Sequence, residues 1–362
     1  MAIGVVGAGS ISTQYLENLT QAPDARVAMV ADLDIARAAD RAKEYGVGAS
    51  GTTDDLLARD DIELVVNLTI PDAHVAVGLD VLRAGKHVYG EKPLGLSVAS
   101  GRELLTTAAE RGLRAASAPD TVLGPGVQAG LRALKRGEIG TPLTALALFQ
   151  VAGPESWHPS PEFLFARGGG PLFDMGPYYL TVLVMALGPA RKVHAVGSRA
   201  WSERVIGSGP RAGTRFPVEV PTHIAGLIEF ASGASATVVF SFESALQRSG
   251  VLEVTGTEGT LVLPDPNTFG GPVGLWRAGA AQAVDVPIAT ERMTRGFGVI
   301  ELARAIRQEV PERCSGELAL HVLEVMEALQ ESAEHGTDVS LTTTVALHEP
   351  LPQDWDPLVA TL

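Results

Sequence analysis

The chain opens with IGVVGAGSIS, in which Gly7 and Gly9 directly follow a short apolar run and Ser12 stands where a third glycine often occurs. Gly7 allows a tight turn, Gly9 lets the backbone approach a phosphate, and a small residue at 12 lets a helix pack closely on the strand. This strand–turn–helix pattern predicts the start of a βαβ unit, and therefore a parallel sheet with helices on its faces.

The rest of the first third keeps this pattern, because short apolar runs alternate with amphipathic ones. A helix is expected from Pro71 to Gly85, since it starts with proline and ends with glycine. Ser97 is predicted to cap another helix that reaches about Arg111. The predicted strands are Ile3–Val6, Val27–Ala31, Leu64–Leu68, His87–Tyr89 and Arg114–Ala118.

Beyond about Gly124 the pattern changes to longer alternating stretches, which favour an antiparallel sheet. We expect helices over 127–135, 298–308 and 317–335, and a loop over 201–221. We therefore predict an α/β chain with a Rossmann-type domain at 1–120, an α+β domain at 121–345 and a tail at 346–362. The strands expected in the second domain are 144–151, 193–199, 223–230, 234–241, 251–255 and 260–263.

Size and charge limit the function classes. A chain of 362 residues suits two domains, and a net charge of −14 argues against nucleic acid or an anionic membrane as partner. Cys314 is the only cysteine, which favours a reducing compartment. There is no signal-peptide pattern, the longest apolar segment is too short to span a bilayer, and the histidines show no metal-ligand spacing. We expect a soluble, cytoplasmic protein without a metal.

The glycine turn and an acid further along predict a dinucleotide. Asp32 in VADLD lies about twenty residues beyond Ser12, at the tip of the second strand, where a carboxylate can bind ribose hydroxyls. Its charge would repel a 2′-phosphate, so NAD is favoured over NADP, although Arg37 weakens that preference. Amides of the first helix, at Ser10 and Ile11, would face the phosphates. The alternative is an ordinary glycine turn followed by a helix-capping aspartate.

Two more loops follow strands at the edge where ligands bind in open α/β sheets, namely NLTIPDAH and YGEKPLG. Lys92 could donate a hydrogen bond or a proton to a substrate oxygen, and the peptide before Pro93 is a candidate for the cis form. The alternative is a solvated surface lysine. The residues expected to contact the cofactor here are Thr69, Pro71, His74, Glu91 and Lys92.

Three motifs together, GAGSIS, EKPLG at 91–95 and GGGPLFDMGPYY at 168–179, resemble the Gfo/Idh/MocA oxidoreductases. That family includes inositol dehydrogenases and glucose–fructose oxidoreductase, and the resemblance covers almost the whole chain. It implies a Rossmann domain followed by an open-faced sheet domain, which carries substrate contacts and commonly a dimer or tetramer interface. It also implies that Lys92 is the catalytic lysine, in hydride transfer between NAD(P) and a secondary alcohol or carbonyl of a sugar, polyol or related cyclic compound.

The third motif departs from the family pattern Asp-x-Gly-x-His, because Asp174 and Gly176 are followed by Tyr178. Glucose–fructose oxidoreductase and the dimeric dihydrodiol dehydrogenases are similar in having tyrosine there. The resemblance therefore implies catalytic roles for Lys92, Tyr178 and Asp174. A nearby cation and a helix N-terminus would lower the pKa of a phenol from about 10. The alternative is that Asp174 merely caps a helix with Pro177 in its first turn and that Tyr178 packs; Tyr179 is assigned to packing.

Candidate substrate contacts complete the prediction. In ESWHPSPEF, Trp157 offers an apolar face that suits a sugar ring, and His158 is a possible acid or base. Asp120 follows the last strand expected in the first domain. All three could instead be structural. Two other functions stay open: a regulatory protein that senses NAD(H) without turnover, and an NAD-using glycosidase.

Overall fold

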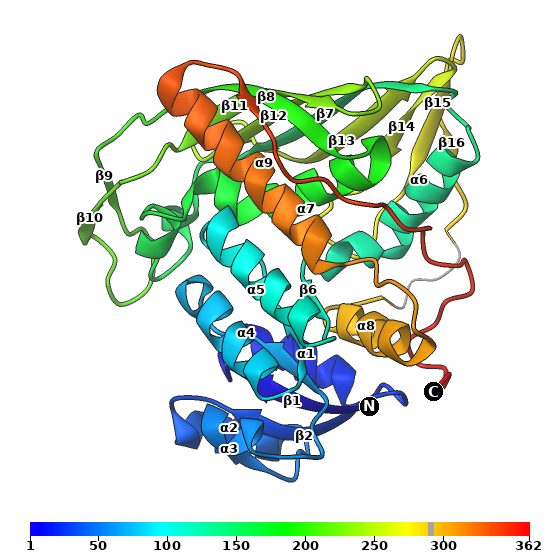
Figure 1. The fold of residues 1–362 in the computed structure, drawn as a ribbon. Coiled ribbons are helices and arrows are strands. Elements are labelled where there is room, and N and C mark those ends of the chain that lie inside the picture. The colour runs from blue at the N-terminus through cyan, green and yellow to red at the C-terminus, as the bar shows by residue number, and fades with distance from the viewer. Residues whose placement is uncertain (289–292) are drawn as a thin grey trace. The chain divides into compact units, whose positions relative to one another are not determined.

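The computed structural model describes residues 1–288 and 293–362, and the chain forms two compact units (Figure 1). The first unit comprises 1–124, the described part of 289–323, and 347–362, and the second comprises 125–288 and 324–346. This corrects the predicted boundaries, because the expected tail and the helix near 298–308 belong with the first unit.

The first unit contains a six-stranded sheet in the order β3-β2-β1-β4-β5-β6, with every pair parallel. This order is that of a doubly wound dinucleotide-binding fold, and the order reverses between β1 and β4. The five predicted strands are confirmed; the two-residue β3 was missed because it is too short to show a pattern. The strands are β1 Ala2–Val6, β2 Arg26–Ala31, β3 Ser50–Gly51, β4 Leu64–Asn67, β5 His87–Gly90 and β6 Ala115–Ser117.

The helices of this unit begin largely where capping signals predict. The Ser97 hydroxyl oxygen accepts the backbone N–H of Ser100 at 3.2 Å, which confirms the expected cap. Pro71 opens a short 3-10 turn, and the regular helix starts only at His74. The helical segments are α1 Ser10–Leu19, α2 Ile35–Glu44, α3 Thr53–Leu57, η1 Pro71–Ala73, α4 His74–Arg83, α5 Val98–Glu110, η2 Asp120–Leu123 and α8 Phe297–Gln308.

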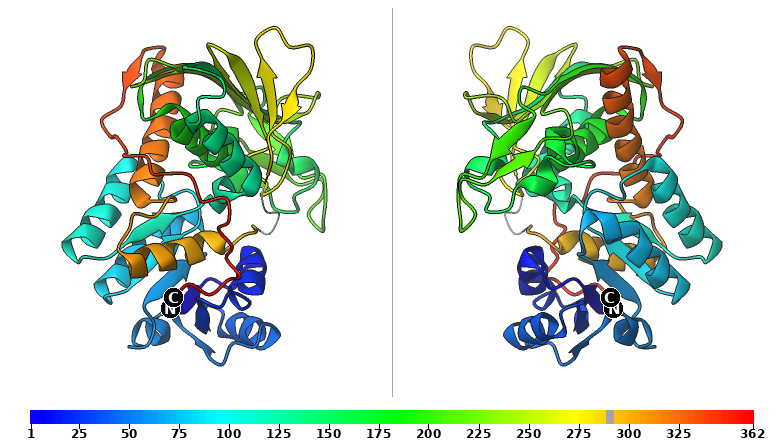
Figure 2. Two further views of the ribbon diagram at one scale, coloured as in Figure 1. Left: turned by 90° about the vertical axis from the view of Figure 1, so that its right-hand side faces the viewer. Right: turned by 90° about the vertical axis from the view of Figure 1, so that its left-hand side faces the viewer.

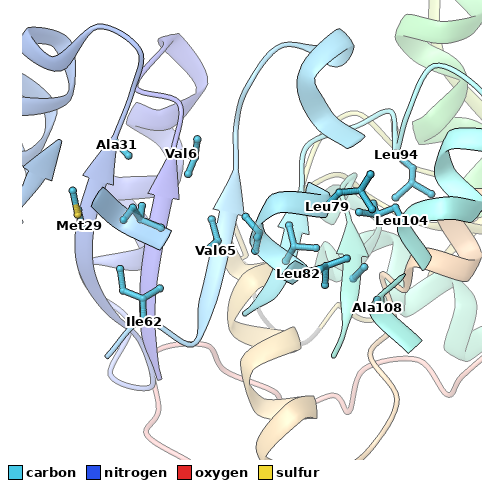
Figure 3. Close-up of a cluster of buried hydrophobic side chains, with 14 of the residues drawn as sticks. Val6, Met29, Ala31, Ile62, Val65, Leu79, Leu82, Leu94, Leu104 and Ala108 are labelled. Carbon is cyan, nitrogen blue, oxygen red and sulfur yellow. The ribbon is translucent and has the colours of Figure 1, made fainter. Parts of the chain in front are cut away.

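A buried apolar cluster joins the parallel sheet to its helices (Figure 3). Val6 and Val65 come from the sheet, whereas Leu82 and Leu104 come from α4 and α5. Fully burying a side chain of this kind contributes about 1.5–3 kcal/mol. The cluster thereby fixes the carboxyl ends of β1, β2 and β4 as one rigid edge.

The C-terminal segment packs against the first unit through a buried ion pair. Arg304 Nε of α8 donates to Asp24 Oδ2 at 2.8 Å, and the backbone N–H and hydroxyl of Thr361 also donate to the Asp24 carboxylate. The Arg304 guanidinium lies 4.9 Å from the ring centroid of Trp355. These contacts explain why residues 347–362 are part of a compact unit and not a free tail.

The second unit contains a nine-stranded sheet in the order β16-β15-β14-β13-β7-β12-β11-β8-β17. Only β7 and β12 pair in parallel, so the predicted, largely antiparallel sheet is confirmed. Helices α6 and α7 and the last part of α9 lie on one face of it (Figure 2). The elements are α6 Pro125–Lys135, β7 Pro142–Gln150, η3 Pro154–Ser156, η4 Glu162–Leu164, α7 Gly170–Leu187, β8 Ala190–Ser198, β11 His223–Phe230, β12 Ser235–Ser241, β13 Arg248–Gly256, β14 Gly259–Leu263, β15 Gly274–Arg277, β16 Val284–Asp285, α9 Gly316–His335 and β17 Val339–Ser340.

One prediction in this unit was wrong, and one alternative that the sequence left open is excluded. The expected loop over 201–221 contains a separate two-stranded sheet, β9 Glu203–Val205 and β10 Arg215–Pro217, which the glycines and arginines of the segment concealed. Helix α7 begins at Gly170, so Asp174 is not its N-cap, and Pro171 occupies the first turn in place of Pro177. Pro177 is tolerated inside the helix because most of that helix is buried, so packing outweighs the lost hydrogen bond.

No helix in the described part of the chain is long and apolar enough to cross a membrane.

We expect Asp24→Ala to lower the free energy of unfolding by roughly 3 kcal/mol, because it leaves buried Arg304 without its partner. Burial alone would raise the pKa of Asp24, but hydrogen bonds from Thr361 and Arg304 outweigh it and lower the pKa. The stabilisation is therefore present above the unfolded pKa of about 3.9 and is lost as pH falls through the folded value. Urea denaturation at neutral and acidic pH measures both effects.

The control is Asp61→Ala, which removes a carboxylate from an exposed ion pair and should cost less. Equal losses for Asp24→Ala and Asp61→Ala would contradict a structural role for the buried pair.

Candidate active site

A pocket of about 390 Å³ opens at the carboxyl edge of the parallel sheet, where the strand order reverses. Four predicted residues line it, namely Gly7, Gly9, Asp32 and Thr69. Other lining residues, which the sequence did not single out for a pocket, are Leu33, Arg37, Thr53, Leu68, Ile70, Ala73 and Val77.

The glycine turn leaves room for a ligand's phosphates. Gly7 has φ +99°, and a Cβ there would lie 2.6 Å from the Leu68 carbonyl oxygen. A Cβ on Gly9 would meet no atom within 4 Å, so the backbone there is open to a close approach. The buried Ser12 hydroxyl donates to the Gly9 carbonyl at 2.6 Å, and no side chain caps the start of α1. The first-turn amides of α1 are thus available to an anion, which fits a dinucleotide pyrophosphate.

Three groups donate hydrogen bonds to the Asp32 carboxylate at the pocket. Its Oδ2 accepts the backbone N–H of Ala8 at 2.7 Å, and Oδ1 accepts that of Asp34 at 2.8 Å and Arg37 Nη2 at 2.6 Å. Burial acts to raise the pKa of Asp32, but these hydrogen bonds, that from Arg37 first, lower it below its usual range. Asp32 is therefore an ionised acceptor. The alternative role of Asp32 as a helix cap is excluded, because Asp34 is the residue that caps α2.

His74, expected to contact a cofactor, lies between two loops. It is 3% exposed, with Nδ1 2.7 Å from the Pro93 carbonyl oxygen and Nε2 3.0 Å from that of Thr69. Both ring nitrogens thus face protein carbonyls, and the contact of His74 with a cofactor stays a prediction. Pro71 opens the 3-10 turn next to Ile70, and its contact with a cofactor stays a prediction.

Lys92 follows β5 at the same edge of the sheet and is half-buried. The Lys92–Pro93 peptide is cis, as predicted. Glu91 is nearly buried and its carboxylate turns inward: Oε1 accepts the Tyr15 hydroxyl at 2.8 Å and Oε2 accepts the Lys92 backbone N–H at 3.0 Å. Contacts of Glu91 and Lys92 with a cofactor stay predictions.

Asp120, predicted to contact the substrate, is bound within the protein, and its contact with a substrate stays a prediction. It is fully buried, and its Oδ2 accepts the backbone N–H of Gly296 at 2.7 Å, while Arg295 lies 3.4 Å from Oδ1. Burial raises the pKa of Asp120 to about 6, against the opposing effect of Arg295 and the backbone amides. Its role is to fix the segment that leads into α8.

In the second unit, Asp174 and Tyr178 lie four residues apart on α7 and therefore share one face of that helix. Tyr178 is 6% exposed, and Asp174 is half-buried. The adjacent Tyr179 is fully buried, packs against the rings of Phe149 and Phe240, and accepts the backbone N–H of Gly250 at 2.7 Å. The assignment of Tyr179 to packing is confirmed.

Trp157 and His158 belong to a short aromatic stack in a surface loop. The His158 ring lies 5.5 Å from the ring of Trp157 and 5.5 Å from that of Phe163, and Trp157 is 67% exposed. An ion pair between Glu155 and Arg204, at 2.5 Å, anchors the start of this loop. The substrate contacts of Trp157 and His158 stay predictions.

Among residues 1–288 and 293–362, no three His, Cys, Asp or Glu side chains gather in a way that could hold a metal ion.

Sequence reasoning missed two residues of this site. Asn67, at the end of β4, accepts from Thr69 and donates to the His74 carbonyl, and Tyr15 binds Glu91. Asn67 stood in the quoted loop motif, so a polar residue that ends an apolar strand was a usable signal. Tyr15 had none, because its partner is 76 residues away.

Two family models match the chain. One, described as an oxidoreductase family with an NAD-binding Rossmann fold, matches residues 1–118, and the GFO/IDH/MocA C-terminal domain matches residues 127–262. With the fold and the pocket, they define an NAD-binding oxidoreductase of the dehydrogenase and reductase class. The chain belongs to the Gfo/Idh/MocA family.

Known relatives agree with this class. The chain is 30% identical over 272 residues to a trans-1,2-dihydrobenzene-1,2-diol dehydrogenase of Oryctolagus cuniculus, covering 72% of this chain and 75% of that one. It is 27% identical over 266 residues to a 1,5-anhydro-D-fructose reductase of Ensifer adhaerens, covering 72% and 74%. Levoglucosan dehydrogenase in complex with NADH and L-sorbose has the same fold, with a TM-score of 0.81 at 20% identity over 95% of this chain and 99% of that one.

We expect Arg37→Ala to weaken NADP binding at least about tenfold, because the guanidinium is the cation at the pocket that offers donors to a 2′-phosphate. NAD binding should hold or tighten, since the Asp32 carboxylate then regains an acceptor site for ribose hydroxyls. Titration with both cofactors measures this. Arg83→Ala, at an exposed pair outside the pocket, is the control; an equal loss for NAD and NADP in Arg37→Ala would contradict the assignment.

Proposed function

We propose that this protein catalyses NAD-dependent hydride transfer to or from a secondary alcohol or carbonyl carbon of a sugar, polyol or related cyclic compound. The observation that carries the proposal is the position of Lys92. The His74 ring lies between the Pro93 carbonyl of the Lys92 loop and the carbonyl of Thr69, which lines the dinucleotide pocket. Lys92 follows β5 at the edge where ligands bind in such sheets.

The residues that would hold the dinucleotide are Gly7, Gly9, Asp32 and Thr69, with the first-turn amides of α1 at Ser10 and Ile11 on the pyrophosphate. When bound, NAD supplies the acceptor for the hydride. Lys92 donates a hydrogen bond from its ammonium to the substrate oxygen and stabilises the negative charge that develops there. A fixed cation does so without rearrangement during the reaction.

Tyr178 is proposed to accept the hydroxyl proton in oxidation and to return it in reduction. A phenol has a pKa of about 10, so it needs a cation close by to act near neutral pH. Asp174, one helical turn earlier on α7, is proposed to orient the substrate or the phenol. Tyrosine thus takes the place of the histidine usual in the family.

The substrate class is supported by the relatives and by one surface feature. The named relatives include an anhydrofructose reductase and a dihydrobenzenediol dehydrogenase, so ring compounds that carry oxygen recur among them. The exposed indole of Trp157 offers an apolar face of the kind that packs on a sugar ring. Appearance of NADH with a panel of D-glucose, myo-inositol, levoglucosan and 1,2-cyclohexanediol tests the proposal. Release of reducing sugar without net NADH would identify a glycosidase instead, and NAD binding without either product would identify a sensor.

We expect Lys92→Ala and Tyr178→Phe each to lower kcat at least about a hundredfold while NAD affinity is kept, because each removes a group that acts on the reacting oxygen. Tyr179→Phe is the matched control, since the Tyr179 hydroxyl serves the Gly250 backbone and should affect stability more than turnover. The double variant should lose less than the product of the single losses. Unchanged turnover in Lys92→Ala would end the assignment.

We also propose that the second unit forms a homodimer or homotetramer through the open face of its large sheet. A Cβ on Gly226 would meet Leu329 of α9, so Leu227 points to the opposite face, where it is 54% exposed. By the same alternation Val196 lies on that face, since a Cβ on its neighbour Gly197 would meet Ala333. Exposed apolar side chains on an open sheet face favour an interface with a second copy of the chain.

We expect Leu227→Glu to dissociate the oligomer, because a buried carboxylate without a partner opposes association. Val310→Glu changes an equally apolar exposed residue in the first unit and serves as control. Sedimentation velocity measures the masses. A monomeric wild type, or an unchanged mass for Leu227→Glu, would contradict the interface.

A cytoplasmic location is proposed on composition. The single cysteine, Cys314, is a buried free thiol, a usage that suits a reducing compartment.

A further inference from the structure

We propose that Tyr15, Glu91 and His74 are positioning residues that fix the backbone of Lys92 relative to the dinucleotide pocket. This inference rests on the proposed function, in which Lys92 acts on the substrate oxygen. None of the three needs to touch substrate: they act through the residues on either side of Lys92.

The clamp on the N-terminal side of Lys92 is the Glu91 carboxylate. One oxygen accepts the Lys92 backbone N–H at 3.0 Å, and the other accepts the Tyr15 hydroxyl at 2.8 Å. Tyr15 is fully buried on α1, the helix whose first turn faces the pocket. Burial and the nearby Glu91 charge raise the pKa of Tyr15, so its hydroxyl stays a donor.

The clamp on the C-terminal side is the His74 ring. It lies 2.7 Å from the carbonyl oxygen of Pro93, the residue after Lys92, and 3.0 Å from that of Thr69. Asn67 completes the link, because its amide donates to the His74 carbonyl at 2.9 Å and its oxygen accepts the Thr69 hydroxyl at 2.7 Å. One clamp therefore starts from α1, which directly follows the pocket residue Gly9, and the other from the loop after β4, in which Thr69 lines the pocket.

The consequence is that the pocket and the lysine share one buried scaffold. Removing one hydrogen bond of a clamp should leave the glycine turn and Asp32 intact, so NAD still binds. The Lys92 ammonium, however, is no longer held in one position, and a displacement of a catalytic group by about 1 Å can lower the rate about a hundredfold. A merely structural role would instead lower stability and leave the properties of the folded lysine unchanged.

The chain offers a matched pair of variants for the test. Tyr15→Phe removes a hydroxyl that donates to Glu91, whereas Tyr89→Phe removes an equally buried hydroxyl that has no hydrogen-bond partner among the described residues. Both keep the ring and its packing. Thermal unfolding shows whether each variant folds. If Tyr15→Phe does not fold, Glu91→Gln is the second variant, because its side chain has one acceptor oxygen for the two donors that Glu91 binds.

The first readout needs no substrate. The chain has five lysines, at 43, 86, 92, 135 and 192, so reductive methylation with a ¹³C label gives few NMR signals, and Lys92→Ala assigns the one of interest. We expect Tyr15→Phe to shift or broaden the Lys92 signal, with the dissociation constant of NAD kept within about threefold. Tyr89→Phe should leave that signal in place. Coincident Lys92 signals in wild type and Tyr15→Phe would overturn the proposal.

The second readout is turnover of NAD with the panel compound that wild type oxidises fastest. We expect kcat to fall about tenfold or more in Tyr15→Phe, to stay unchanged in Tyr89→Phe, and to fall no further when Tyr15→Phe is added to Lys92→Ala. If Lys92→Ala keeps full turnover, the proposed function fails. If Lys92→Ala is inactive but Tyr15→Phe matches Tyr89→Phe in turnover, only the positioning role is wrong.

Discussion

The steric constraint at Gly7 governs the arrangement of the first unit. With φ +99° and the Leu68 carbonyl 2.6 Å from any added Cβ, no other residue fits between β1 and the loop after β4. The chain therefore turns sharply into α1 and brings the first-turn amides of this helix to the edge of the sheet. The same turn places Tyr15 on the buried side of α1, in reach of Glu91. Anion binding and the support of Lys92 thus follow from one backbone geometry.

The pocket is lined by a negative and a positive side chain, Asp32 and Arg37, and not by the carboxylate alone. Asp32 is the acid that a dinucleotide-binding sheet uses for ribose hydroxyls, yet here it is paired with Arg37 at 2.6 Å. The pair keeps Asp32 ionised while it reduces the repulsion that a lone carboxylate would exert on a phosphate. Since Arg37 is half-exposed, it can move when a ligand enters. We therefore propose that Asp32 and Arg37 together decide between NAD and NADP.

Local signals allowed much of the fold to be predicted. The Gly7 turn, the Ser97 cap and the alternating strands each depend on a few adjacent residues, and all are present. The contacts between residues distant in sequence could not be predicted. Asp120 holds Gly296, His74 binds Pro93, and the segment near Thr361 returns to Asp24, and none of these pairings leaves a local pattern. The start of α7 was misplaced because two prolines, at 171 and 177, both suit a first turn.

The central claim is that a hydride passes between substrate carbon and NAD and that Lys92 assists this step. Deuterium transfer measures this hydride step directly. Panel compounds that carry deuterium on the carbinol carbon are incubated with NAD and enzyme, and the mass of the NADH formed is measured by mass spectrometry. The account predicts singly deuterated NADH with the wild type and at least about a hundredfold less with a Lys92→Ala protein that binds NAD normally. Deuterium-free NADH, or equal transfer by both proteins, would contradict it.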